Sequence, residues 1–313
     1  MTLSCICYST DRGYLYPTML SALQARAQSR EDQASVCIVA IDLDAAVEAL
    51  FRSICDRENI LFIPISRERI RGLKSTFCRL FLDELLPPQF DRILYIDGDT
   101  QIRGSMDDLL GISLGSMQVM GASDPMAFLA TENSKVGREL RTYMLGLGFT
   151  PQQLGSYFNA GVLYAGREGW AALSAAALRF FEEHRAACKF LDQSALNAVS
   201  RLQHVPMSLR WNFPAFLMNC NVERQIRPVI YHFMSNPRPW NGAFLPWTKD
   251  FVDPYIEMER RFPELIPFRP AFSLRQRMRY HLQQRYKKLM EMATWRWTSR
   301  RRALLSYEAQ ISG

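Results

Sequence analysis

Short β-rich runs alternate with helix-like segments over the first two-thirds of the chain, and this alternation constrains the fold more than any other feature of the sequence. Such an order is typical of α/β architecture with a largely parallel sheet. We expect strands at residues 3–8, 36–41, 61–65, 92–97, 119–123, 158–164 and 228–233. We expect helices at residues 17–27, 45–56, 75–85, 169–184 and 192–200. The 313 residues suffice for a large domain with a buried core.

The longest apolar runs are the length of strands. Residues 61–65 and 118–122 fall far short of the ~20 residues that a transmembrane helix needs. The start of the chain has no basic segment and too short an apolar stretch for a signal peptide, so we expect a cytoplasmic protein. The seven cysteines lie mostly in apolar runs, which favours reduced, buried side chains over a disulfide or metal role.

The positive charge of the chain is concentrated at its C-terminal end. Residues 269–302 hold eleven Lys or Arg and a single acid, Glu291. Residues 1–268 hold 27 basic and 29 acidic residues, so this part is nearly neutral. We therefore place a boundary between a main domain, residues 1–268, and a basic C-terminal segment, residues 269–313.

Apolar residues of the C-terminal segment recur at three- or four-residue steps, which predicts one apolar stripe along a helix. The stripe consists of Leu274, Met278, Leu282, Tyr286, Leu289, Ala293 and Trp297. Basic side chains around such a face are typical of a helix that lies on an anionic membrane surface, which is the interpretation we favour. Two alternatives are that the stripe packs on the main domain and that the charge binds nucleic acid. We expect no nucleic-acid partner.

The most informative segment is residues 92–100, in which an apolar strand ends in Asp97-Gly98-Asp99. Ligands of open α/β sheets bind beyond the carboxyl ends of the strands. Two carboxylates there cannot both stay ionised at low cost unless a cation shares their charge. Their oxygens suit Mg²⁺ or Mn²⁺, which substrate phosphates usually help to coordinate. The alternative is a polar turn without a ligand.

Further blocks surround this acidic turn in a fixed order. They are Phe77-x-Arg79-Leu80, Ser-Thr-Asp-Arg-Gly-Tyr at 9–14, Tyr-Phe-Asn-Ala-Gly-Val-Leu at 157–163, Leu-Asp-Gln-Ser-Ala-Leu-Asn at 191–197 and His-Phe-Met-Ser-Asn-Pro-Arg-Pro-Trp at 232–240. Together they resemble glycosyltransferase family 8, which includes bacterial lipopolysaccharide galactosyl- and glucosyltransferases and the glycogenins. The resemblance spans residues 4–240. It implies a GT-A type catalytic domain at 1–268, with a single Rossmann-like, mostly parallel sheet flanked by helices.

The resemblance also implies a nucleotide pocket that begins after the first strand. There Asp11 would accept a hydrogen bond from uracil and Tyr14 would stack on it, and both roles suit the chemistry of these side chains. Thr10 and Gly98 would line the same donor site. Arg79 would approach the diphosphate or the sugar. The alternatives are that Asp11 caps the following helix and that Arg79 lies on a solvated helix face.

By the resemblance, His232 corresponds to a metal ligand of the family and would complete a site with Asp97 and Asp99. The alternative is a buried core histidine that binds no metal. An imidazole beside two carboxylates favours Mn²⁺ over Mg²⁺, with Mg²⁺ as the alternative. The block departs from the family at Ser235, where glycine is usual, and at Arg238, where lysine is usual. Arg238 keeps the charge and is able to hold two phosphate oxygens, so we expect diphosphate binding to be preserved with altered geometry.

The resemblance assigns the donor sugar to four further residues. Asn159 and Asp192 would hold sugar hydroxyls, Gln193 would lie near the anomeric carbon, and Asp124 would lie near sugar and acceptor. Many members carry an aspartate after this glutamine, but here Ser194 follows it. A covalent retaining mechanism needs a positioned carboxylate, and the sequence offers no obvious one. We therefore favour front-face substitution.

These observations predict a metal-dependent, retaining hexosyltransferase. Its donor would be UDP-galactose or UDP-glucose, and its acceptor a lipopolysaccharide or another surface glycan, either free or lipid-linked. The protein would be peripheral on the inner face of the plasma membrane. The alternatives are a glycogenin-like initiator that glucosylates itself, and an inactive relative that binds glycans or membranes.

Overall fold

The structure, a computed structural model, describes residues 3–201, 203–296 and 298–312. Its main sheet has the strand order β3-β2-β1-β4-β7-β6-β8. The strands are β1 (Ser4–Asp11), β2 (Ala34–Ile41), β3 (Ile60–Ile65), β4 (Arg92–Ile96), β6 (Val119–Ser123), β7 (Phe158–Gly166) and β8 (His204–Met207). Only β7 runs antiparallel to its neighbours β4 and β6. The predicted α/β fold with a mostly parallel sheet is confirmed.

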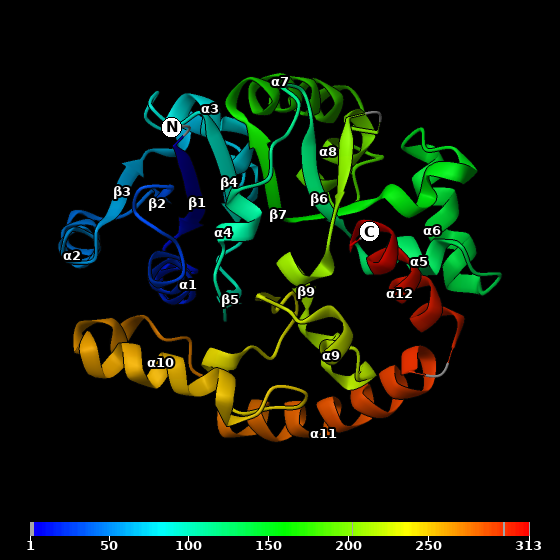
Figure 1. Ribbon diagram of the computed structural model, residues 1–313. Helices are drawn as coiled ribbons and strands as arrows, with labels where there is room; N and C mark the ends of the chain where they lie inside the picture. Colours follow the sequence, from blue (N-terminus) through cyan, green and yellow to red (C-terminus); the bar gives the residue numbers. More distant parts are fainter. Residues whose placement is uncertain (1–2, 202, 297, 313) are drawn as a thin grey trace.

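A smaller sheet lies beside the main one and was not expected as a separate unit. It has the order β5-β10-β9 and consists of β5 (Thr100–Ile102), β9 (Phe213–Pro214) and β10 (Ile230–His232). The expected strand at 228–233 is β10. Because β4 and β5 are separated only by residues 97–99, the chain passes from one sheet to the other at the acidic turn. Figure 1 shows β5 and β9 below the strands of the main sheet.

Helices cover both faces of the main sheet (Figure 1). The helices that precede the C-terminal segment are α1 (Leu15–Ala27), α2 (Ala45–Arg57), α3 (Leu82–Leu85), α4 (Asp107–Leu110), α5 (Pro125–Ala130), α6 (Lys135–Gly146), α7 (Arg167–Glu183), α8 (Leu191–Val199), α9 (Glu223–Ile226) and α10 (Lys249–Arg261). The helix expected at 75–85 is instead a 3-10 helix, Ser75–Phe81, followed by α3. The Trp170 indole donates to the Arg79 carbonyl in this segment at 2.8 Å.

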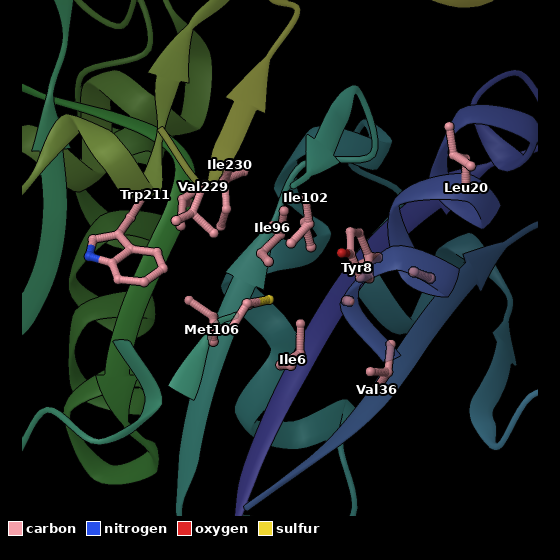
Figure 2. Close-up of a cluster of buried hydrophobic side chains, with 14 of the residues drawn as sticks. Ile6, Tyr8, Leu20, Val36, Ile96, Ile102, Met106, Trp211, Val229 and Ile230 are labelled. Atoms are coloured by element: carbon pink, nitrogen blue, oxygen red, sulfur yellow. The ribbon is translucent and has the colours of Figure 1, made fainter. Parts of the chain in front are cut away.

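Alternate residues of the central strands enter two different cores, because successive side chains of a strand point to opposite faces. Cys5 and Cys7 pack in the core with α3 and α7, whereas neighbouring Ile6 and Tyr8 enter the core on the opposite face. All seven cysteines are free and buried, as predicted. Figure 2 shows the second core, which joins β1 and β4 to the small sheet through Ile6, Tyr8, Ile96, Ile102 and Ile230.

The basic C-terminal segment forms two helices instead of the single predicted one. α11 (Leu274–Glu291) leads into a π-helical turn, Met292–Arg296, and then into α12 (Ser299–Ser312). The hydroxyls of Thr294 and Thr298 donate to carbonyls four residues back, an arrangement that often bends helices. Figure 1 shows α11 along one side of the molecule and α12 turned back towards α5 and β6. Trp297, the last predicted stripe residue, lies outside the described residues.

The stripe on α11 faces away from the main domain. Its five members on this helix are between 62% and 75% exposed: Leu274, Met278, Leu282, Tyr286 and Leu289. The opposite face of α11 packs on the main domain, where Gln284 is buried and the Tyr280 ring contacts Phe244. Among the described residues, no helix has both the length and the apolar character that a membrane crossing requires.

Candidate active site

The turn Asp97-Gly98-Asp99 joins the last residue of β4 to the first residue of β5. Helix α1 packs closely against it. A Cβ atom on Gly98 would lie 2.0 Å from Oγ1 of Thr18 and 3.3 Å from its Cα. A side chain therefore cannot be accommodated here without moving the helix, which explains why glycine separates the two carboxylates.

His232 reaches the turn from the small sheet. β10 pairs with β5 in a register that sets His232 opposite Thr100. Nε2 of His232 lies 3.1 Å from Oδ1 of Asp99 and 3.7 Å from Oδ2 of Asp97. One ligand atom from each of the three residues lies within 4.8 Å of the others. The predicted convergence of Asp97, Asp99 and His232 is thus confirmed as a group able to hold a metal ion.

Two arginines bind the outer oxygens of these carboxylates. Nη2 of Arg79 lies 3.2 Å from Oδ1 of Asp97, and Nη2 of Arg238 lies 3.1 Å from Oδ2 of Asp99. The other oxygen of each carboxylate faces His232. Arg79 is only 6% exposed and also pairs with Asp192 at 2.8 Å, so the alternative of a solvated helix face is wrong.

Electrostatics in this group suit a cation. Burial raises the pKa of Asp99, but the charges of His232 and Arg238 outweigh it and hold that pKa below its usual value. Burial lowers the pKa of His232, but Asp99 and Asp97 outweigh it and raise that pKa. The raised pKa of His232 therefore favours a proton on the imidazole beside the carboxylates in the metal-free protein. Two carboxylates and an imidazole form a donor set that fits Mn²⁺ or Mg²⁺, whose binding would displace this proton.

A buried hydrogen-bond relay fixes the orientation of His232. The side-chain N–H groups of Asn212 donate to Oδ1 of Asn159 at 2.9 Å, and those of Asn159 donate to Oδ2 of Asp124 at 3.0 Å. Oδ1 of Asn212 is therefore the acceptor for Nδ1–H of His232, at 2.9 Å. Because Nδ1 is engaged by Asn212, Nε2 points towards the two carboxylates. This is the orientation that a metal-binding histidine requires.

A pocket of about 530 Å³ opens on one side of the turn and is lined by Asp124, Asn159, Asp192 and Gln193. Oε1 of Gln193 accepts from the Ala160 N–H at 3.0 Å, and its Nε2 donates to Oδ2 of Asp124 at 3.3 Å. The four residues predicted to hold the sugar are thus brought together. We call this cavity the sugar-side pocket, after the role that the sequence predicts for these residues.

Ser194 follows Gln193 but faces elsewhere. It is fully buried, and its Oγ accepts from the Phe190 N–H at 2.8 Å and bonds the Tyr143 hydroxyl at 2.7 Å. The serine thus helps to begin α8. Ser194, which stands where many family members carry an aspartate, is therefore not part of the lining of the sugar-side pocket.

A second pocket, of about 290 Å³, opens on the other side of the turn. It is lined by Thr10, Asp11 and Tyr14, and it shares Arg79 and Asp97 with the sugar-side pocket. Oδ1 of Asp11 accepts from the Gly13 N–H at 3.0 Å, so Asp11 supports the local turn and also lines the pocket. The two pockets meet at the acidic turn. We call this second cavity the nucleotide-side pocket.

Two residues of the site were not assigned there from the sequence. The Tyr95 hydroxyl donates to Oδ1 of Asp97 at 2.7 Å, and its ring packs on Arg79. The sequence could have indicated Tyr95, because residues two apart on a strand share a face and Tyr95 precedes Asp97 by two. Asn212 is buried, and nothing local in the sequence indicates its bond to His232.

The free energy of unfolding of the metal-free protein should fall as the pH rises from about 5 to about 7.5. Burial raises the pKa of Asp192 to about 6, with Arg79 opposing only part of the effect. In this range the folded state binds more protons than the unfolded state, so charging Asp192 costs about 1–2 kcal/mol. The raised pKa values of Asp124 and His232 act in the same direction, whereas the pKa of His204, which burial lowers, opposes them. Urea denaturation in EDTA measures this; a flat or rising profile would contradict it.

Comparison with known proteins identifies a family and several relatives. The sequence profile described as "Glycosyl transferase family 8" matches residues 5–243. A lipopolysaccharide 1,2-glucosyltransferase of Escherichia coli (strain K12) is 21% identical over 302 residues, which cover 91% of this chain and 85% of the relative. A lipopolysaccharide 1,3-galactosyltransferase of Salmonella typhimurium (strain LT2) is 21% identical over 262 residues, which cover 76% of this chain and 74% of the relative.

A solved structure has the same fold. The crystal structure of the galactosyltransferase LgtC in complex with donor and acceptor sugar analogs matches with a TM-score of 0.63 and 20% identity. The match covers 81% of this chain and 95% of that chain.

Proposed function

Because the chain belongs to glycosyltransferase family 8, we propose that it is a metal-dependent, retaining hexosyltransferase that moves galactose or glucose from a UDP-sugar to a lipopolysaccharide or similar surface glycan. The observation that carries the proposal is the convergence of Asp97, Asp99 and His232 within 4.8 Å, at the place where the two pockets meet. A nucleotide on one side and a sugar on the other would set the diphosphate beside this group.

The charged residues of the site fit a diphosphate leaving group. A bound divalent cation, with Mn²⁺ favoured, would neutralise the charge that develops on the departing UDP. Arg238 lies 3.1 Å from Asp99 and within 5.4 Å of the Tyr14 ring, so its guanidinium can bind phosphate oxygens at the mouth of the nucleotide-side pocket. Arg79 is held between Asp97 and Asp192 and keeps its charge between the pockets. Donors fixed in advance stabilise such charge at little reorganisation cost.

Front-face substitution is the mechanism that we favour for retention. Both oxygens of Asp124 already accept hydrogen bonds, Oδ1 from the Met126 N–H and Oδ2 from Asn159 and Gln193. Asp192 is paired with Arg79. Asp124 is therefore committed to hydrogen bonds, and Asp192 to an ion pair with Arg79 in which its Oδ2 accepts no hydrogen bond from the residues that the structure describes. A leaving diphosphate oxygen would then take the proton of the acceptor hydroxyl. A stable aspartyl-glycosyl adduct trapped in the wild-type protein would overturn this mechanism.

A donor screen tests the proposed activity. Purified full-length protein is incubated with Mn²⁺ and a panel of UDP-sugars, and UDP release is measured with and without EDTA. We expect metal-dependent hydrolysis of UDP-galactose or UDP-glucose, which an oligosaccharide acceptor accelerates. Mass spectrometry of the protein after incubation with UDP-glucose separates this from glycogenin-like self-glucosylation. If no UDP-sugar is hydrolysed, the chain is an inactive relative and the proposal is wrong.

We also propose that α11 holds the enzyme on an anionic membrane surface, where lipid-linked acceptors are found. The support is an exposed stripe, Leu274 to Leu289, beside exposed Arg275, Arg279 and Arg285. Each basic residue near an anionic surface contributes about 1 kcal/mol, and buried apolar side chains add to it. This surface would place the protein on the inner face of the plasma membrane.

The double variant Leu282→Glu with Leu289→Glu should lose vesicle binding. Each change removes an apolar contact and adds a charge that anionic lipid repels, so we expect the partition coefficient to fall at least about 10-fold. Co-sedimentation with vesicles that contain phosphatidylglycerol measures it. Val136→Glu on α6, also an exposed apolar position, is the matched control. Unchanged sedimentation of the double variant would rule out α11 as the anchor.

A further inference from the structure

The last helix of the chain contacts the main domain at two polar points that lie next to each other in its sequence. The Tyr307 hydroxyl accepts from the Ser123 N–H at 3.1 Å and donates to the Met207 carbonyl at 2.7 Å. The carboxylate of Glu308 accepts from the Ser208 hydroxyl at 2.7 Å and from the Leu209 N–H at 2.6 Å. These two residues, Tyr307 and Glu308, are called the α12 clamp below.

Tyr307 closes the ends of two neighbouring strands. Ser123 is the last residue of β6 and Met207 the last of β8, and the ladder between these strands ends at the pair Ala122 and Met207. The phenol hydroxyl therefore bridges the next N–H and the last C=O where the strands diverge. The residue directly after Ser123 is Asp124, the terminal acceptor of the buried relay.

Glu308 holds the other end of the relay. Ser208 precedes the 3-10 helix Leu209–Trp211, and its hydroxyl also accepts from the Arg210 N–H at 3.1 Å. Glu308 therefore binds both the capping hydroxyl and the first N–H of this helix, a favourable place for a carboxylate. The residue directly after the helix is Asn212, which holds Nδ1 of His232.

Further contacts fix α12 and the turn before it in this place. Arg300 forms a two-bond ion pair with Glu132 at 2.6 and 2.8 Å. Trp295 is buried against Phe128 of α5 and against Phe216, which lines the sugar-side pocket. Leu304 is 1% exposed in the core that contains β6 and the small sheet. The C-terminal segment is thus packed into the domain through α12, although the stripe on α11 is open.

We propose that α12 is a positioning element of the active site: Tyr307 sets the position of Asp124 on the sugar side, and Glu308 sets that of Asn212, and through it His232, on the metal side. The proposal rests on the proposed function for the roles of the two sides. It makes the C-terminal segment part of the catalytic domain instead of a detachable anchor, so the boundary at residue 268 does not separate independent units. It also means that truncation after Arg269 would remove the anchor and the clamp together.

Two single variants of the full-length chain test the clamp. Tyr307→Phe keeps the ring on Phe128 but leaves the Ser123 N–H and the Met207 C=O without their partner. Glu308→Gln keeps the size but turns one acceptor into a donor. Tyr280→Phe, on α11 and away from both strand ends, is the control. Kd for Mn²⁺ is measured by electron paramagnetic resonance, and affinities for UDP and UDP-sugar are measured with Mn²⁺ present.

The two variants should differ in what they impair. Tyr307→Phe should lower kcat and the preference for UDP-sugar over UDP by about 10-fold, with Mn²⁺ affinity unchanged. Glu308→Gln should weaken Mn²⁺ binding by about 10-fold, the size typical for groups that orient a metal-bound histidine. A purely structural clamp would lower the unfolding free energy and leave these constants of the folded protein as in wild type, which would overturn the proposal.

A readout without catalysis separates the clamp from the enzyme assignment. Hydrogen exchange of the Ser123 amide should speed up in Tyr307→Phe, and that of the Leu209 amide in Glu308→Gln. If wild-type protein hydrolyses no UDP-sugar, the proposed function fails while these exchange rates still decide the clamp. If exchange at both amides is unchanged, the clamp is wrong whatever the activity of the wild type.

Discussion

Replacing Asp99 with asparagine should lower the rate of UDP release from the donor by at least about 10³-fold, which corresponds to about 4 kcal/mol of transition-state stabilisation. The substitution keeps the size of the side chain and removes its charge. Asp99 is the centre of the charge group, because Oδ1 lies 3.1 Å from His232 and Oδ2 lies 3.1 Å from Arg238. A neutral amide would offer one weak ligand oxygen in place of the carboxylate.

Metal binding gives a second measurement of the same variant. Mn²⁺ should raise the melting temperature of the wild type by an amount that grows with its concentration, because a ligand that binds only the folded state stabilises it. In Asp99→Asn this rise should shrink at equal Mn²⁺ concentration. Asp108→Asn is the control, since that carboxylate is 80% exposed at the start of α4. If Asp99→Asn released UDP at the wild-type rate, the group formed by Asp97, Asp99 and His232 would have no part in the mechanism.

Much of this site could be predicted because its parts are local. A β-strand that ends in two carboxylates is visible in nine residues, and the position of ligand sites at the carboxyl ends of strands follows from the architecture. The glycine between the carboxylates was visible too, but its cause was not. The steric limit comes from Thr18, whose helix packs on the turn only in the folded chain.

His232 shows where local reasoning ends. It lies 133 residues beyond Asp99, and only the resemblance to a family connected the two. The structure supplies the physical reason, which is the register of β10 against β5. No family motif pointed to Asn212. Its position depends on the small sheet and on Glu308, which lies nearly 100 residues further along the chain. Contacts between distant segments carry no periodic signal in the sequence.

The C-terminal segment was predicted in its pattern but not in its shape. The periodicity of Leu274 to Leu289 correctly gave an amphipathic helix, and exposure of the stripe agrees with a surface role. The period alone could not reveal the bend at Met292–Arg296, because Ala293 continues the apolar pattern through it. The residue that is buried at the bend, Trp295, lies outside the stripe, and its partners Phe128 and Phe216 are far away in the chain. In the sequence, the exposed stripe of α11 and the docked helix α12 therefore looked like a single helix.

Replacing Gly161 with alanine should displace the metal-ligand candidate His232. The new Cβ would lie 2.2 Å from Cε1 of His232, 2.7 Å from its Nδ1 and 2.9 Å from Oδ1 of Asn159. β7 is held at this point on the β4 side, because the Gly161 carbonyl accepts from the Asp97 N–H at 2.7 Å and Val162 pairs with Ile96. His232 is only 4% exposed and cannot turn outward. The imidazole must therefore leave its place between Asn212 and the carboxylates.

We expect Gly161→Ala to lose about 1–3 kcal/mol of stability from overpacking and about 10²-fold in turnover from the displaced ligand. Gly146→Ala, at an exposed end of α6 with open space around it, is the matched control and should be neutral or slightly stabilising. Urea denaturation and UDP release measure the two effects. If both glycine variants behave alike, the close approach at Gly161 is wrong.

A double-mutant cycle identifies the clash itself. His232→Ala removes the atoms that the new methyl group would meet at 2.2 and 2.7 Å, while Asn159 remains at 2.9 Å. Adding Gly161→Ala to that background should then cost much less stability than in the wild type, with a coupling of about 1–2 kcal/mol, because residues in contact are not additive. Activity would stay lost, since the ligand is gone. Equal costs in the two backgrounds would instead locate the damage in β7, and the glycine of this strand would then serve the sheet and not the metal ligand.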